Sequence, residues 1–128
     1  MSYHFSKRLD VPFDQAITRV TEALKREGFG VLTDIDVSAT MKAKLGEDSR
    51  PYRILGACNP QLAHRALQLE DKIGTMLPCN VIVQQHADGG VEVSAVDPVA
   101  SMQAIKNPDL AEIAKEVQAK LRKVVASL

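Results

Sequence analysis

A change of hydrophobic period marks the segment YRILGACNPQLAHRAL, residues 52–67. Up to Cys58 the side chains alternate between two faces, and this pattern predicts a strand over residues 52–58. Asn59 can then accept an unpaired backbone N–H at a helix start, and Pro60 suits the first turn because it has no N–H to leave unpaired. The segment therefore predicts a strand that ends at Cys58 and a helix over residues 60–69.

The chain before this segment alternates between strand and helix signals. Residues 3–8 alternate in polarity and predict a short, half-exposed strand. Pro12 opens a stretch whose apolar residues recur every three or four positions, and Gly28 can adopt the left-handed conformation that ends such a helix. Residues 29–35 alternate again as a strand, and residues 36–46 predict a short helix with capping residues in front and a glycine behind.

The chain after the segment predicts a hairpin and a final helix. Val81–His86 and Val91–Val96 flank Asp88-Gly89-Gly90, which is a hairpin signal because glycine supplies the positive φ that tight turns require. Residues 99–105 predict a short helical turn. Asn107 and Pro108 repeat the cap and first-turn pair. The apolar stripe of the last helix consists of Leu110, Ile113, Val117, Leu121, Val124 and Leu128.

This order of elements predicts the fold class. Strands and helices do not alternate regularly, as a doubly wound parallel sheet would require, and two strands are joined directly by a hairpin. We therefore expect an α+β fold with helices packed on a sheet. A chain of 128 residues has the usual size of one domain, and no linker or repeat divides it. The prediction is a single domain over residues 1–128.

Charge and composition bear on the class of partner. Sixteen basic and sixteen acidic side chains cancel, so the excess of Lys and Arg that favours nucleic acid or an anionic membrane is missing. The first eight residues carry charge where a signal peptide needs an apolar stretch, and apolar runs such as Val81–Val83 are far shorter than a membrane span. We expect a cytoplasmic protein whose two cysteines are thiols.

Five short segments resemble one known family. They are Val11–Phe13, Gly28–Leu32, Gly56–Pro60 with Leu62-Ala63 after it, Leu77–Val81 and Val96–Pro98. Their pattern is similar to that of the family catalogued as "domain of unknown function 302". The resemblance implies a fold similar to that of the TATA-binding protein, with a curved antiparallel sheet and helices on one face. It also implies subunits that pair as homodimers, and it implies no established reaction.

Cys58 and Cys79 are the leading candidates for a functional site. Cys58 ends a strand just before a helix, where unpaired N–H groups and the positive end of the helix dipole favour a thiolate, so we predict a lowered pKa. Cys79 begins another strand after Pro78. If the two strands are neighbours in the sheet, the thiols can come within reach of a disulfide or a shared metal ion. Asn59 and Asn80 follow the two cysteines and complete a candidate ligand-binding set.

Each of these residues also has an ordinary structural interpretation. A free cysteine often packs as a small apolar side chain. Asn59 is a natural helix cap, and Asn80 is a natural turn or strand-edge residue. Two cysteines alone do not complete a zinc site, which needs four ligands, so the sequence assigns no metal ligands and indicates no cofactor.

Five further residues have both a functional and a structural interpretation. His4, His64 and His86 are separate in sequence, and each is interpreted as a solvated side chain rather than as a metal ligand. Asp97 could place a carboxylate at the mouth of a pocket or form a turn. Arg53 could bind an anion or form a salt bridge on its strand.

Three hypotheses about function follow. The leading one is a dimeric binding module for a small molecule or a metal ion, built around Cys58 and Cys79. Its pocket is expected to be lined by the concave or helix-free part of the sheet and by the two Cys-Asn elements. The second is a thiol-dependent redox protein with Cys58 as nucleophile. The third is a structural or interaction protein that reserves part of the apolar stripe of its last helix, residues 110–128, for a partner chain. Whether the protein is an enzyme stays open, because none of the common phosphate-loop, nucleophile-elbow or zinc-protease motifs is present.

Overall fold

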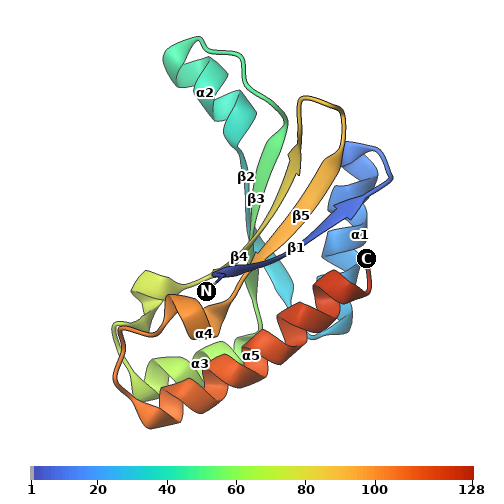
Figure 1. The fold of residues 1–128 in the computed structure, drawn as a ribbon. Coiled ribbons are helices and arrows are strands. Elements are labelled where there is room, and N and C mark those ends of the chain that lie inside the picture. The colour runs from blue at the N-terminus through green and yellow to red at the C-terminus, as the bar shows by residue number, and fades with distance from the viewer. Residues whose placement is uncertain (1) are drawn as a thin grey trace.

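The core of the fold is a curved antiparallel sheet (Figure 1). The computed structural model describes residues 2–128. The strands lie in the order β1-β5-β4-β3-β2, and every neighbouring pair is antiparallel. Their bounds are β1 (His4–Leu9), β2 (Gly30–Asp36), β3 (Tyr52–Cys58), β4 (Cys79–Gln85) and β5 (Val91–Val96). The predicted α+β fold with an antiparallel sheet is confirmed.

The main helices cover one face of this sheet and leave the other face open (Figure 1). Their bounds are α1 (Phe13–Arg26), α2 (Val37–Leu45), α3 (Pro60–Leu69), α4 (Pro98–Ser101) and α5 (Pro108–Ala126), with a 3-10 turn η1 (Ile73–Met76) before β4. The long α5 contacts α1, α3, α4 and the strands β1 and β5. It therefore joins the helical layer together.

The hydrophobic core lies between the sheet and these helices. Alternate residues of the central strands point into it, for example Val81 and Val83 of β4, which are fully buried. They meet the apolar faces of α1 and α5. The buried residues of α5 are Leu110, Ile113, Ala114, Val117, Leu121, Val124 and Val125. The stripe of the last helix is thus used inside its own chain, and the prediction that part of it serves a partner is wrong for these positions.

Local sequence signals set the helix ends. The side chain of Asn59 accepts the N–H of Leu62 at 3.3 Å, and the side chain of Asn107 caps α5 in the same way. Gly28 follows α1 with a φ of 84°, a conformation that costs glycine little because it has no Cβ. The predicted caps are confirmed because each depends on contacts a few residues away.

One helix lies apart from the core. α2 projects from the end of β2 and β3, away from the other helices (Figure 1). None of the residues in Val37–Leu45 is buried. Its start is fixed by Asp36, whose carboxylate accepts the N–H of Ala39 at 2.9 Å. Its stability in the isolated chain therefore comes from capping and from β2 and β3, not from burial.

Gly56 lies in β3 between Thr33 of β2 and the start of β4. It pairs with Thr33 on one side and Asn80 on the other. A Cβ atom at Gly56 would lie 2.1 Å from the hydroxyl oxygen of Thr33 and 2.7 Å from the Cγ atom of Pro78. Both distances are below van der Waals contact, so only glycine fits.

We predict that Gly56→Ala lowers the free energy of unfolding by about 1–3 kcal/mol, the usual cost of overpacking a core. Gly30→Ala is the matched control, because a Cβ at Gly30 meets no atom within 4 Å. Urea denaturation measures both. Equal stability of the two variants would contradict this account of the packing.

Candidate functional site

A cavity of about 290 Å³ lies at the end of the sheet where β3 stops and β4 starts. Its walls come mainly from two helices: Leu62, Ala63 and Ala66 of α3 and Leu110, Ile113 and Ala114 of α5. Leu32 and Leu67 also line it and are 66% and 45% exposed, so the cavity communicates with solvent. The arrangement is an apolar hollow between helices, which is a common location for a ligand site.

Cys58 and Cys79 both line this cavity. Cys58 is the last residue of β3 and Cys79 is the first residue of β4, and these strands are neighbours. Cys79 pairs with Ala57, so the two cysteines lie one residue apart in the register. Both are free thiols. The pairing of the two strands thus brings together two residues that are 21 positions apart in the chain.

The two asparagines lie on different sides of the sheet. Asn59 lines the cavity beside Cys58 while it caps α3. Asn80 is exposed and lines a separate hollow on the helix-free face. Strand alternation explains the separation, because Cys79 and Val81 point toward the helices and Asn80 between them points away. The structure therefore brings Cys58, Asn59 and Cys79 together and leaves Asn80 outside this group. The expectation that the helix-free part of the sheet lines their pocket is wrong, because the two cysteines lie on the side of α3 and α5.

The electrostatics of the thiols differ from the prediction. Burial raises the pKa of Cys58 above its ordinary value. Burial, with a smaller contribution from Cys58, raises the pKa of Cys79 to about 11. The predicted lowering of the pKa of Cys58 is wrong, because loss of hydration in the apolar cavity disfavours the thiolate. At the start of α3, the N–H of Leu62 is bound by Asn59 rather than directed at the sulfur.

The three histidines do not form a site. His4 bonds to Ser6 through Nδ1 at 2.7 Å, His86 bonds to Glu92 through Nε2 at 3.0 Å, and His64 is exposed on α3. His4 lies in β1, His64 lies in α3, and His86 lies in the turn after β4. Within residues 2–128, no three His, Cys, Asp or Glu side chains are grouped so that they could hold a metal ion.

Asp97 and Arg53 have structural partners. The carboxylate of Asp97 caps α4 by accepting the N–H of Val99 at 3.0 Å, and it also accepts an N–H of Gln118 at 3.0 Å. Arg53 donates from Nε to Asp34 at 2.7 Å, and this hydrogen bond lowers the pKa of Asp34. The structural interpretation accounts for both residues.

The sequence did not reveal the cavity itself. The residues that could have indicated it are small side chains on two helices, Ala63 and Ala66 of α3 and Ala114 of α5. Alanine in a helix is ordinary, and only the tertiary packing shows that these three face each other. The cavity exists because their side chains are too short to fill the space between α3 and α5.

We predict that alkylation of the folded protein by iodoacetamide is slow at pH 7–8 and rises only at higher pH. Since the fold raises the pKa of both thiols, they stay protonated where unfolded thiols already ionise. Cys58, which is half-buried, should react before the buried Cys79, whose reaction is half-maximal near pH 11. Because the pKa of each thiol is higher in the folded than in the unfolded chain, ionisation of the thiols favours the unfolded state. The free energy of unfolding should therefore fall as pH rises from about 9 to 11.

Intact mass and peptide mapping follow this reaction. Urea-unfolded, reduced protein is the control, and its thiols should react with a pKa of about 8.5. If the alkylation rate of Cys58 in the folded protein reached half its maximum below pH 8, the account would be contradicted.

Comparisons with known proteins agree with this fold. The model of the family described as "domain of unknown function DUF302" matches residues 5–128. A crystal structure of an uncharacterised conserved DUF302 protein from Bacillus stearothermophilus is similar, with a TM-score of 0.91 and 31% sequence identity over 98% of each chain. None of the curated proteins matches the chain significantly. The chain therefore belongs to the DUF302 family.

Proposed function

We propose that this protein is a binding module for a small apolar ligand, which it holds in the cavity between α3 and α5. The observation that supports this most strongly is the composition of the walls, which are carbon and sulfur atoms almost throughout, with Asn59 as the single polar residue among the described lining. A volume of about 290 Å³ is near the lower end of the range of roughly 300–1,000 Å³ for ligand pockets. A short chain or a small ring system fits such a space.

The physical driving force is the removal of apolar surface from water. Each Å² of apolar surface that a ligand covers is worth about 25 cal/mol before the cost of association is subtracted. The helices α3 and α5 are held by their caps and by the core, so little of this energy is spent on ordering the site. A preformed apolar pocket is the arrangement that makes such binding favourable.

The two thiols contribute to the pocket as apolar groups. Their raised pKa keeps Cys58 and Cys79 protonated at neutral pH, and a protonated cysteine behaves as a small hydrophobic side chain. This weakens the redox hypothesis, since a thiol nucleophile acts as the thiolate. It also weakens a metal role, because two neutral thiols must each lose a proton before they coordinate.

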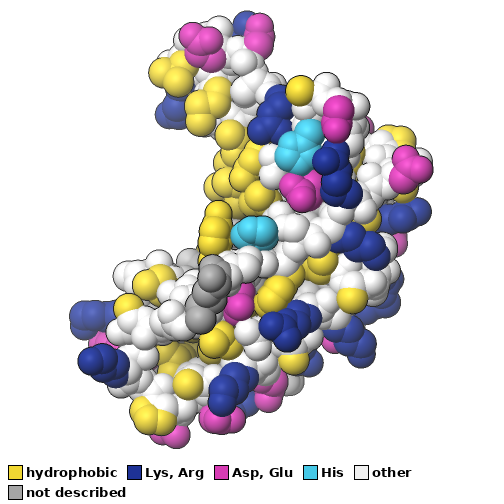
Figure 2. Space-filling view, in the orientation of Figure 1, with side chains coloured by type: hydrophobic (Ala, Val, Ile, Leu, Met, Phe, Trp, Pro, Cys, Tyr) yellow, Lys and Arg dark blue, Asp and Glu magenta, His cyan; other side chains and the backbone are white. Residues whose placement is uncertain are grey.

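We also propose that the protein is a homodimer. β2 is an edge strand with one neighbour, and α2 extends beyond it with no buried residue. Leu32 and Ile35 of β2 and Met41 and Leu45 of α2 are all exposed. Figure 2 shows hydrophobic side chains on the concave side of the molecule, between the projecting helix and the helices at the other end. A second copy of the chain would cover this apolar arm and complete the packing of α2.

The compartment is a further part of the proposal. Both cysteines are free thiols in an apolar pocket, and such thiols persist in a reducing environment. We therefore assign the protein to the cytoplasm. Separately, none of the helices within residues 2–128 has the length and apolarity needed to cross a bilayer.

The first test is binding of N-phenyl-1-naphthylamine, a neutral apolar probe whose fluorescence rises in apolar surroundings. We predict saturable binding to the native protein. Ala63→Phe should weaken the binding at least tenfold, because the added ring occupies the space beside Leu62 and Ala66. The native protein should also be protected from alkylation at Cys58 when the probe is bound.

The matched control is Ala119→Phe, which adds the same ring to an exposed position of α5. It should bind the probe as the native protein does, and circular dichroism should show that both variants are folded. Equal binding by both variants would contradict the location of the site.

The second test is the oligomeric state by sedimentation velocity. We predict a dimer for the native chain and a monomer for the double variant Met41→Glu with Leu45→Glu, because two carboxylates on α2 would have to be buried at the interface. Met76→Glu changes an equally exposed methionine far from α2 and should remain a dimer. A native chain that is monomeric at all concentrations would contradict the homodimer.

A further inference from the structure

A second hollow lies on the helix-free face of the sheet, over β1, β5 and β4. Its volume is about 420 Å³. The sheet separates it from the apolar cavity, which lies on the side of the helices. The two hollows share no lining residue among residues 2–128, so this one calls for a separate explanation.

Three side chains in this hollow form a hydrogen-bonded chain. Ser6 and Ser94 are paired across β1 and β5, and their hydroxyl oxygens are 2.7 Å apart. The hydroxyl of Ser6 also lies 2.7 Å from Nδ1 of His4. Each of these groups can both donate and accept. Because they hold one another in place, they offer an ordered set of donors and acceptors before any ligand arrives.

The remaining walls combine amide groups with apolar surface. Asn80 and Gln84 of β4 contribute side-chain amides, and Ile82 lies between them on the same face of the strand. Tyr52 borders the hollow on β3, and Tyr3 borders it beside His4. The ring of Tyr3 meets the ring of His4 edge-on, with centroids 4.9 Å apart. Aromatic rings with polar tips suit a ligand that has both C–H and hydroxyl surface.

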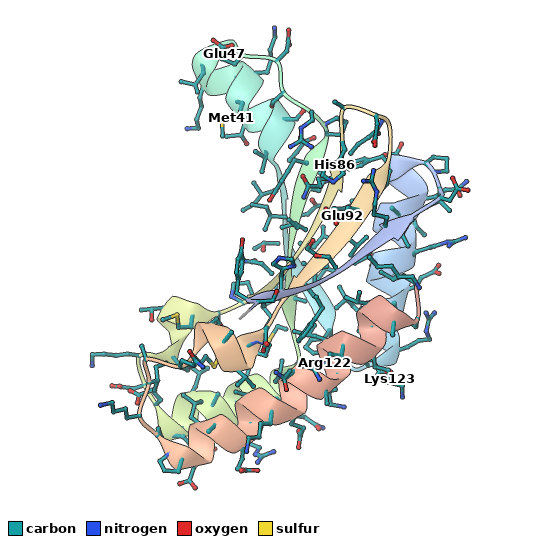
Figure 3. The ribbon with its side chains drawn as sticks, in the orientation of Figure 1. Met41, Glu47, His86, Glu92, Arg122 and Lys123 are labelled. Carbon is teal, nitrogen blue, oxygen red and sulfur yellow. The ribbon has the colours of Figure 1, made fainter. Side chains whose placement is uncertain are left out.

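The charges of the hollow restrict the ligand class. No Lys or Arg of residues 2–128 lines it, and Glu92 is its one acidic group. The carboxylate of Glu92 is already bound by His86 at 3.0 Å, and Figure 3 shows these two side chains together on the β4–β5 hairpin. One cation lies at its edge: Arg50 donates to the side-chain oxygen of Gln84 at 3.3 Å and to the backbone oxygen of Gln85 at 3.1 Å. An anionic ligand would therefore meet the carboxylate of Glu92 inside the hollow and, at its edge, an Arg50 that is already engaged. A cationic ligand would have to compete with His86.

From this set of groups, we propose that the hollow binds a neutral polyhydroxylated ring of monosaccharide size. The two serines, His4 and the amides of Asn80 and Gln84 bind its hydroxyl groups. Ile82 and the tyrosine rings cover its C–H surface. This site is independent of the apolar cavity, so either proposal can fail without the other.

The test is NMR titration of the ¹⁵N-labelled native protein with six neutral probes: glucose, galactose, mannose, N-acetylglucosamine, ribose and myo-inositol. We expect at least one of them to shift amide signals of β1, β4 and β5 with a Kd in the millimolar range. Ser94→Ala should weaken that binding about fivefold to tenfold, the effect of losing one hydrogen bond. Ser127→Ala removes a hydroxyl at the end of α5, on the other side of the sheet, and should change nothing.

Inorganic phosphate is titrated as the anionic probe and should not shift these signals. The absence of binding by all six neutral probes would overturn the proposal. So would tighter binding of phosphate than of any neutral probe, or binding that is equal in the native protein and Ser94→Ala.

Discussion

The pairing of β3 with β4 is the constraint on which the rest of the structure depends. It places Ala57 opposite Cys79 and Gly56 opposite Asn80, at the end of the sheet where α3 begins. Because β3 passes directly into α3 through the Asn59 cap, the same register fixes the direction in which α3 leaves the sheet. α5 then packs against α3 and the core. The cavity, both thiols and the close packing at Gly56 all follow from this one alignment of strands.

The two faces of the sheet have opposite chemistry because of strand alternation. On the side of the helices, β4 presents Cys79, Val81 and Val83, and the short alanines of α3 and α5 leave an apolar space. On the open side it presents Asn80, Ile82 and Gln84 beside the serines of β1 and β5. A single strand thus contributes to an apolar cavity on one face and to a polar hollow on the other. Burial raises the pKa of the thiols on the first face, which suits packing and apolar binding better than thiolate chemistry.

Features that depend on near neighbours could be predicted from the sequence, and features that depend on distant packing could not. The caps at Asn59 and Asn107 and the stop at Gly28 rest on local hydrogen bonds and backbone freedom, so the order and approximate bounds of the elements were predictable. β4 begins at Cys79, as its place after Pro78 predicted, and the pairing of Cys79 with Ala57 extends the strand two residues before Val81, where the hairpin pattern began. The direction of the pKa shift at Cys58 was wrong because desolvation depends on the packing of α3 and α5 around it. Alternation along β4 could have predicted that Asn80 points away from Cys79. The cavity between α3 and α5 could not be predicted, because the alanines that border it are ordinary in helices. The likeness to the TATA-binding protein stays a prediction.

The central claim is that the space between α3 and α5 is an apolar site that accepts an apolar occupant. Diffraction from a crystal pressurised with xenon tests this most directly, since xenon enters dry apolar cavities and is seen by its electron density. The account predicts a xenon atom among Leu62, Ala66 and Ile113, near the two sulfur atoms. Ordered water in that space, or closure of the helices onto each other without xenon, would contradict it.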